Sequence, residues 1–92
     1  MPDAKVTREQ MCAMLARYAA ACGMDLSGAD ASACDGFTDK DYIEPCIYDS
    51  VNAMCAIGII KGYGDGTMLP KCSVTRAEAA TMLVRLEDVL AA

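Results

Sequence analysis

A chain of 92 residues with a net charge of −5 fits one small domain, and its eight Lys and Arg are scattered without a basic run, which argues against nucleic acid as a partner. No segment approaches the roughly 20 consecutive apolar residues of a membrane-spanning helix. Residues 1–5 lead directly into a helical pattern instead of a cleavable signal peptide, so an exported protein would have to carry this sequence as a mature fragment.

The first predicted helix covers residues 7 to 22. Thr7 and Gln10 fit a capping box, in which the hydroxyl accepts from the backbone three residues on and the amide reaches back. Gly23 fits a C-terminal cap. One apolar face is predicted from residues that recur at helical spacing: Met11, Met14, Leu15, Tyr18 and Cys22.

A long loop is predicted over residues 23 to 41, where Gly, Ser and Asp favour turns and side-chain-to-backbone bonds. Its carboxylates suggest calcium, but the spacing does not fit an EF-hand. Counted from Asp30, Asp35 stands at the sixth position, where Gly is needed, and Asp41 at the twelfth, where a bidentate Glu is needed. We therefore interpret these carboxylates as solvated turn residues and expect no metal site.

The second predicted helix covers residues 45 to 57. Pro45 suits its first turn and Gly58 ends it. Its apolar face is formed by four residues: Ile47, Val51, Met54 and Cys55.

The third predicted helix covers residues 75 to 90, and Thr75 with Glu78 forms a second capping box. Its predicted apolar face consists of Ala79, Met82, Leu83, Leu86 and Leu90. Residues 74–85 repeat the pattern of residues 6–17, from Val-Thr-Arg through Met-Leu-x-Arg. The sequence thus predicts an all-α domain of three principal helices joined by long loops.

The six cysteines form no C-x-x-C pair and the chain has no His, so a structural zinc site of ordinary spacing is not expected. Cys22 and Cys55 fall on apolar helical faces and are interpreted as small buried hydrophobes. Cys34, Cys46 and Cys72 lie in or beside loops and are the better disulfide candidates. The connectivity stays open.

Catalysis is not expected, because a Cys nucleophile normally needs an adjacent base and His is lacking. The glycines at 62, 64 and 66 have neither the spacing of a phosphate-binding loop nor a preceding strand, so a turn is the favoured interpretation. No cofactor is expected.

Four short motifs resemble, in order and spacing, the S-layer homology repeat: Phe37-Thr38-Asp39, Gly58-Ile59-Ile60-Lys61-Gly62-Tyr63, Asp65-Gly66-Thr67 and Thr75-Arg76-Ala77-Glu78. One full repeat spans residues 37–88, and residues 6–22 look like the closing helix of a preceding repeat. We therefore interpret residues 1–92 as a single domain similar to this family.

The resemblance implies a non-catalytic module that anchors exported proteins at the bacterial cell wall or S-layer, by binding an acidic, pyruvylated secondary cell-wall polysaccharide. It implies glycan contacts at the Arg of the Thr-Arg-Ala-Glu motif, Arg76, and at Arg8 on the partial repeat. Four further residues match the family's loop positions: Asp39, Lys61, Gly62 and Tyr63.

Physical chemistry agrees with an anion site at Arg76. An Arg at the start of a capped helix lies beside exposed backbone N–H groups and the positive end of the helix dipole. The alternative is a structural role, in which Arg8 and Arg76 pair with nearby acidic residues or pack the aliphatic part of their side chains over the helices.

A second hypothesis is a protein-interaction or self-assembly module on the same scaffold. Wall-binding domains of the family usually combine three repeats, and this chain offers one repeat and one further helix. So small a core also leaves apolar faces without enough partners, which predicts a homo-oligomer, most simply a dimer with twofold symmetry.

Overall fold

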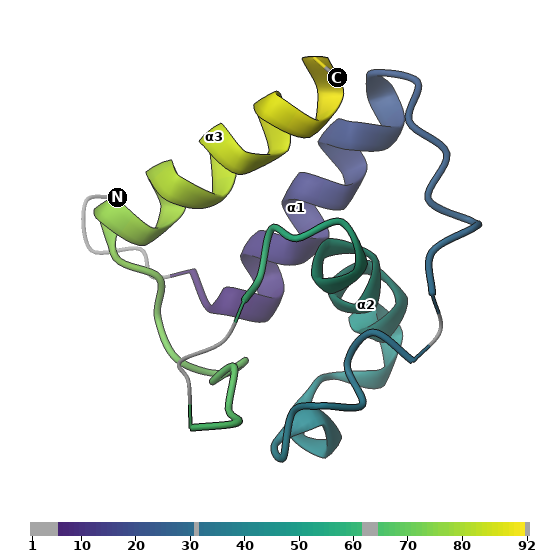
Figure 1. Ribbon diagram of the computed structural model, residues 1–92. Helices are drawn as coiled ribbons and strands as arrows, with labels where there is room; N and C mark the ends of the chain where they lie inside the picture. The colour runs from purple at the N-terminus through teal and green to yellow at the C-terminus, as the bar shows by residue number, and fades with distance from the viewer. Residues whose placement is uncertain (1–5, 31, 62–64, 92) are drawn as a thin grey trace.

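The computed structural model describes residues 6–30, 32–61 and 65–91, and within these ranges it is helical without a strand (Figure 1). Helix α1 spans Arg8–Ala21, α2 spans Tyr48–Ala56 and α3 spans Arg76–Ala91. Two 3-10 turns, η1 (Lys40–Tyr42) and η2 (Pro45–Ile47), precede α2. The predicted all-α fold is confirmed, with the difference that the helix expected from residue 45 begins as a 3-10 turn.

Both predicted capping boxes are present. At α1, the Thr7 backbone N–H donates to Gln10 Oε1 over 2.9 Å and Thr7 Oγ1 accepts from the Gln10 N–H over 3.3 Å. At α3, the same two bonds join Thr75 and Glu78 over 3.0 and 3.1 Å. Gly23 follows α1 with a φ of +93°, a left-handed conformation that favours glycine.

Helix α1 is the central element, because it packs against both α2 and α3 (Figure 1). Its buried apolar residues are Cys12, Leu15, Ala16 and Ala19. The predicted apolar face was therefore partly wrong, since Met14, Tyr18 and Cys22 are exposed. The buried face is offset from the predicted one and consists mainly of small side chains, which let the neighbouring helices approach closely.

The other two helices follow their predicted faces more closely. On α2, Val51 and Met54 are buried, as are Met82 and Leu86 on α3. Leu83, predicted to face the core, is 39% exposed instead. Connecting segments complete the core with Cys34, Ile43, Ile59, Ile60 and Met68.

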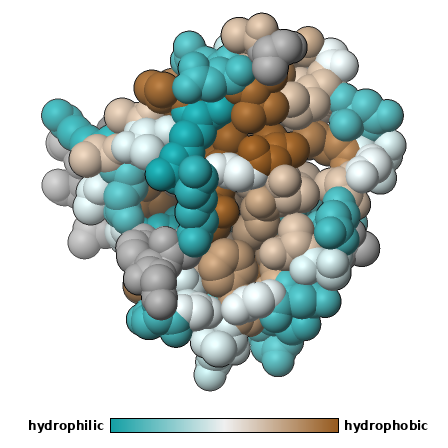
Figure 2. Space-filling model, in the orientation of Figure 1, coloured by the Kyte–Doolittle hydropathy of each residue, from teal (hydrophilic) through white to brown (hydrophobic). Residues whose placement is uncertain are grey.

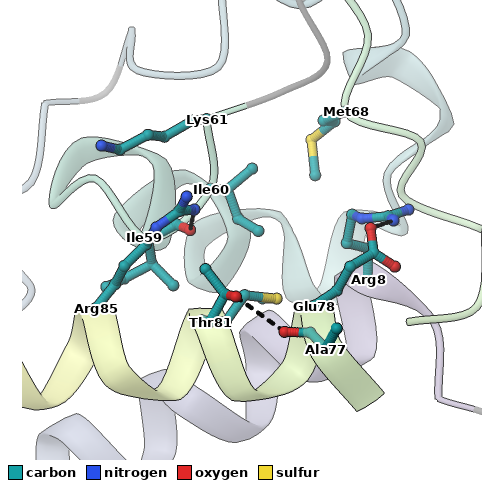
Figure 3. Close-up of a pocket in the computed structure, with 10 residues that line it drawn as sticks. Arg8, Ile59, Ile60, Lys61, Met68, Ala77, Glu78, Thr81 and Arg85 are labelled. Carbon is teal, nitrogen blue, oxygen red and sulfur yellow. Dashed lines mark hydrogen bonds and ion pairs between the residues drawn. The ribbon is translucent and has the colours of Figure 1, made fainter. Parts of the chain in front are cut away.

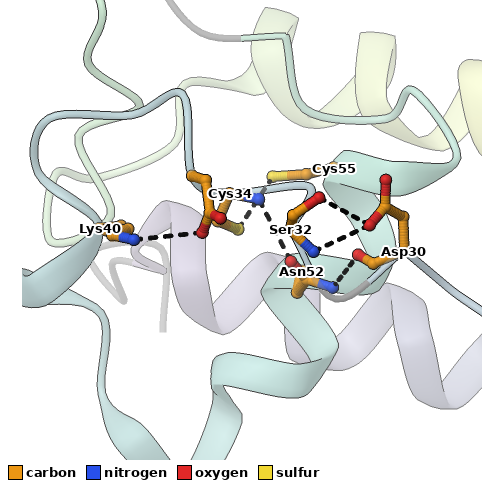
Figure 4. A network of polar contacts seen from close by, with 7 residues as sticks. Asp30, Ser32, Cys34, Lys40, Asn52 and Cys55 are labelled. Atoms are coloured by element: carbon orange, nitrogen blue, oxygen red, sulfur yellow. Dashed lines mark hydrogen bonds and ion pairs between the residues drawn. The ribbon is translucent and has the colours of Figure 1, made fainter.

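The loop between α1 and η1 is built from turns closed by aspartates, as its composition predicted. The carboxylates of Asp25 and Asp30 accept from the backbone N–H groups of Ser27 and Ser32, each over 2.9 Å. Buried Asn52 then fastens the loop to α2 (Figure 4). Its Nδ2 donates to the Asp30 carbonyl over 2.7 Å, and its Oδ1 accepts from the Cys34 N–H over 3.2 Å.

The surroundings of the cysteines match the predictions in part. All six are free thiols in this structure. Cys22 is exposed, so the prediction of a buried hydrophobe was wrong there. Cys55 is half-buried. Cys34 lies in the loop, as predicted, and is fully buried there, where its backbone N–H donates to Asn52 on α2.

The start of α1 lies alongside the segment that leads into α3. Thr7 and Ser73 form an isolated antiparallel bridge. The Arg8 N–H donates to the Cys72 carbonyl over 2.9 Å, and the Glu9 N–H donates to the Pro70 carbonyl over 3.0 Å. These bonds bring the beginnings of α1 and α3 together, which positions the site described next.

Candidate functional site

A groove of about 270 Å³ lies between α3, the start of α1 and the segment that follows α2 (Figure 3). Its polar lining consists of Arg8, Lys61, Glu78, Thr81 and Arg85, and its apolar lining of Ile59, Ile60, Met68, Ala77 and Met82. Residues more than 70 positions apart in sequence therefore meet at one surface.

Arg8 and Glu78 form an ion pair at one end of the groove (Figure 3). Arg8 is buried, and its Nη1 also donates to the Leu69 carbonyl over 3.1 Å. The Glu78 carboxylate accepts a hydrogen bond from the Thr75 backbone N–H in the capping box. That backbone bond, followed by the bond from Arg8, lowers the pKa of Glu78, so this carboxylate is negatively charged at neutral pH.

Lys61 and Arg85 lie toward the other end of the groove (Figure 3). Arg85 is half-buried, and its Nη1 donates to the Ile59 carbonyl over 3.0 Å. That bond fixes the guanidinium while using one of its five N–H donors. Lys61 is exposed. This end of the groove thus presents two cations beside Ile59 and Ile60.

The groove is more basic than the rest of the molecule. Its lining holds three basic side chains and one carboxylate, in a chain whose net charge is −5. The first turn of α3 also contributes Ala77 and Glu78 to the lining, so the positive end of that helix lies nearby. The arrangement suits an anionic ligand that also carries an apolar group.

The structure brings two of the predicted site residues, Arg8 and Lys61, into this groove. Arg76 is exposed at the first residue of α3 and is not part of the groove lining. Gly62 and Tyr63 lie outside the described residues.

Asp39 does not line the groove, and its role is structural. Its Oδ1 accepts from the Met68 N–H over 3.1 Å, and its Oδ2 accepts from the Leu69 N–H over 2.9 Å. Leu69 has a φ of +52°, an unfavourable conformation for a residue with a side chain. The Asp39 carboxylate thus holds a strained turn that places Met68 in the groove.

A second ion cluster fixes the segment that leads into α3. The Glu9 carboxylate is buried and accepts from Lys71 Nζ over 2.9 Å and from the Glu44 N–H over 3.1 Å. The pKa of Lys71 is raised by its bond to Glu9. The cluster fastens the segment before α3 to the start of α1, and we assign it to the scaffold.

Sequence reasoning missed Arg85, Thr81 and the groove-facing position of Glu78. Residues 78, 81 and 85 share one face of a helix by their spacing, which is the signal that was available. Arg85 also has a counterpart in the repeat, Arg17, which is exposed on α1. The spacing alone does not tell which of the two arginines faces a groove.

The family model of the S-layer homology domain matches residues 36–80. This range includes Lys61, Met68 and Glu78 of the groove, while Arg8 and Arg85 lie outside it. No curated protein and no solved structure matches the chain. Among the helices that the structure describes, none has the length and apolar character needed to cross a membrane.

Proposed function

We propose that this chain binds an acidic polysaccharide of the bacterial cell wall. The proposal is supported by the match of residues 36–80 to the S-layer homology domain, a family that generally anchors proteins at the cell surface. The protein then acts outside the cell, associated with the wall or the S-layer, as a binding module without catalytic activity. In this proposal residues 37–88 are one full repeat and α1 closes a preceding one.

The basic groove is the observation that carries the proposal. A pyruvate ketal on a sugar combines a carboxylate with a methyl group. The cationic side chains of Lys61 and Arg85 suit the carboxylate, and the neighbouring apolar surface of Ile60 suits the methyl group. We propose pyruvylated secondary cell-wall polysaccharide as the ligand on this chemistry.

The site residues fall into four groups in this proposal. Lys61 and Arg85 contact the anion directly. Arg76 contacts the glycan from its exposed position beside Ala77, next to the groove. Arg8 and Asp39 hold the walls of the site. Gly62 and Tyr63 remain expected contacts that follow Lys61 in the chain.

Titration of purified pyruvylated wall polysaccharide into the protein tests this function. Lys61→Ala and Arg85→Ala should each weaken binding roughly 10-fold or more, since a bond to a charged group contributes about 1.5–3 kcal/mol. Arg17→Ala is the matched control, because Arg17 holds the position on α1 that Arg85 holds on α3. It should bind like the parent.

Two results would reject the proposal. One is a parent protein that does not bind the polysaccharide. The other is equal weakening by Arg17→Ala and Arg85→Ala, which would mean that only net charge matters. Removing the pyruvate from the polysaccharide should abolish the difference in binding affinity between the parent protein and Arg85→Ala.

The exposed apolar residues favour a second candidate function, self-assembly through the same scaffold. Met14 and Tyr18 on α1 are 54% and 48% exposed, and Val84 on α3 is 57% exposed. Figure 2 shows apolar residues gathered in the upper part of the view, where Figure 1 places α3 and the end of α1. A homodimer that covers these residues is compatible with glycan binding.

A further inference from the structure

Two core cysteines lie close together outside the groove. Cys34, in the loop before η1, is fully buried, and Cys55 is near the end of α2. The Cys34 thiol donates to Cys55 Sγ with the two sulfurs 3.5 Å apart (Figure 4). Neither residue belongs to the groove lining.

Helix α2 holds both partners of this contact. Asn52 accepts from the Cys34 backbone N–H, and Cys55 follows three residues later, on the same side of the helix. The loop cysteine is thereby docked over the helix cysteine. A disulfide needs its sulfurs about 2.05 Å apart, so the two sulfurs have to approach by roughly 1.5 Å, which a small shift of the loop and its side-chain torsions supplies.

We propose that Cys34 and Cys55 are a site of disulfide formation, oxidised by thiol–disulfide exchange with a small-molecule or protein disulfide. The thiolate of one cysteine attacks a sulfur of that disulfide and releases one thiol. The second cysteine then attacks the mixed disulfide and releases the other thiol. The two cysteines lose two protons and two electrons, and the partner disulfide is reduced to two thiols.

The pair is oxidised while the chain folds. Burial raises the pKa of both Cys34 and Cys55, so in the closed core few of these thiols are thiolates and exchange is slow. Before the loop packs against α2 during folding, both sulfurs are exposed to solvent. Docking of Asn52 onto the loop then brings the pair together.

Cys12 is the competing partner in the core. It is fully buried on α1, and burial, together with the nearby Cys34, raises its pKa to about 12. The sulfur contact at 3.5 Å joins Cys34 to Cys55, not to Cys12. The geometry therefore favours one pairing over the two that involve Cys12.

Peptide mapping tests the pairing in a chain that keeps the three core cysteines. In a variant with Cys22, Cys46 and Cys72 replaced by Ser, trypsin places each remaining cysteine in its own peptide, 9–17, 18–40 or 41–61. The variant is refolded with oxidised and reduced glutathione, its free thiols are alkylated under denaturing conditions, and the digest is analysed by mass spectrometry.

The expected product joins peptides 18–40 and 41–61, with peptide 9–17 alkylated, and intact protein is lighter by the two hydrogens lost. Three alkylated peptides, or a link that includes 9–17, would overturn the proposal. The oxidised form should also melt higher than the reduced form by roughly 10 °C, because the bond closes a loop in the unfolded chain. An equal or lower Tm would contradict a bond that fits this core.

Discussion

Arg8 and Arg76 hold equivalent positions at the starts of two similar helices, but their surroundings differ. Arg8 is buried because the segment before α3 packs along the start of α1, where its guanidinium reaches both Glu78 and the Leu69 carbonyl. Arg76 is exposed. One arginine is therefore part of the packed structure, while the other is exposed to solvent.

Glu78 makes stability depend on pH in a defined direction. Its pKa is lowered in the folded protein from an ordinary value of 4.5, first by the Thr75 N–H and then by Arg8. Its contribution is therefore present above the unfolded-state pKa and is lost as pH falls through the lower folded-state value. Glu78→Gln should destabilise the protein near pH 7, and the difference from the parent should shrink below about pH 4.

Urea unfolding at several pH values measures this difference. The substitution isolates the charge, because Gln10 already serves the same capping position on α1. Glu87→Gln, at an exposed position of α3, is the control and should leave the pH dependence unchanged. A Glu78→Gln difference that is constant from neutral to acid pH would contradict the assignment.

Asn52 is the residue on which the long loop depends. Asn52→Ala removes one acceptor and one donor and leaves the Cys34 N–H and the Asp30 carbonyl without these partners. We expect a loss of about 1–3 kcal/mol in the free energy of unfolding. Asp49→Ala, an exposed change on the same helix, should have a much smaller effect in the same chemical denaturation series. Equal effects would show that the loop is not held by this side chain.

The helices differ in how strongly their own sequences define them. The starts of α1 and α3 are fixed locally by capping boxes. Helix α2 is short, at nine residues, and the Ile47 position before it has no side-chain cap bond. Its stability has to come from packing Val51 and Met54 against the core. Local capping thus fixes where α1 and α3 begin, beside the groove. Burial of apolar side chains stabilises α2.

Thr75→Ala should cost roughly 0.5–2 kcal/mol of stability through the lost cap of α3. Arg76→Ala, one residue later, should change stability by less than about 0.5 kcal/mol, because Arg76 is exposed. In glycan titrations the order of the two effects should reverse, and Arg76→Ala should weaken binding more than Thr75→Ala does. Comparing urea midpoints with binding curves separates the two variants. Loss of both stability and binding in Arg76→Ala would assign it to the scaffold.

At the scale of the whole molecule, self-association remains a prediction. The exposed side chains of Met14 and Tyr18 on α1 and Val84 on α3 leave apolar area that a second copy can cover. Sedimentation at about 100 μM, well above a micromolar dissociation constant, should show a dimer. Met14→Lys should shift it toward monomer, whereas Tyr42→Lys, at an exposed aromatic on η1, should not. A clean monomer for the parent would exclude the dimer.

The sequence by itself determined the three α-helices of the described residues, but not the two 3-10 turns before α2. Capping boxes, Gly23 and helical spacing act within a few residues, so they are readable without knowing the fold. The family motifs are local in the same way, and they led to the S-layer homology domain that the family model matches. One of these motifs also contains Lys61, which lines the groove.

Only the tertiary structure decided which face of α1 is buried and which side chains form the groove. Arg8 meets Glu78 across 70 residues, and Arg85 bonds to Ile59 across 26. The sequence gives Arg17 and Arg85 the same repeat position, yet only Arg85 lines the groove. Spacing along one helix cannot distinguish them, because the difference is made by the segment that packs opposite each helix, and that packing is settled by the burial of the whole core.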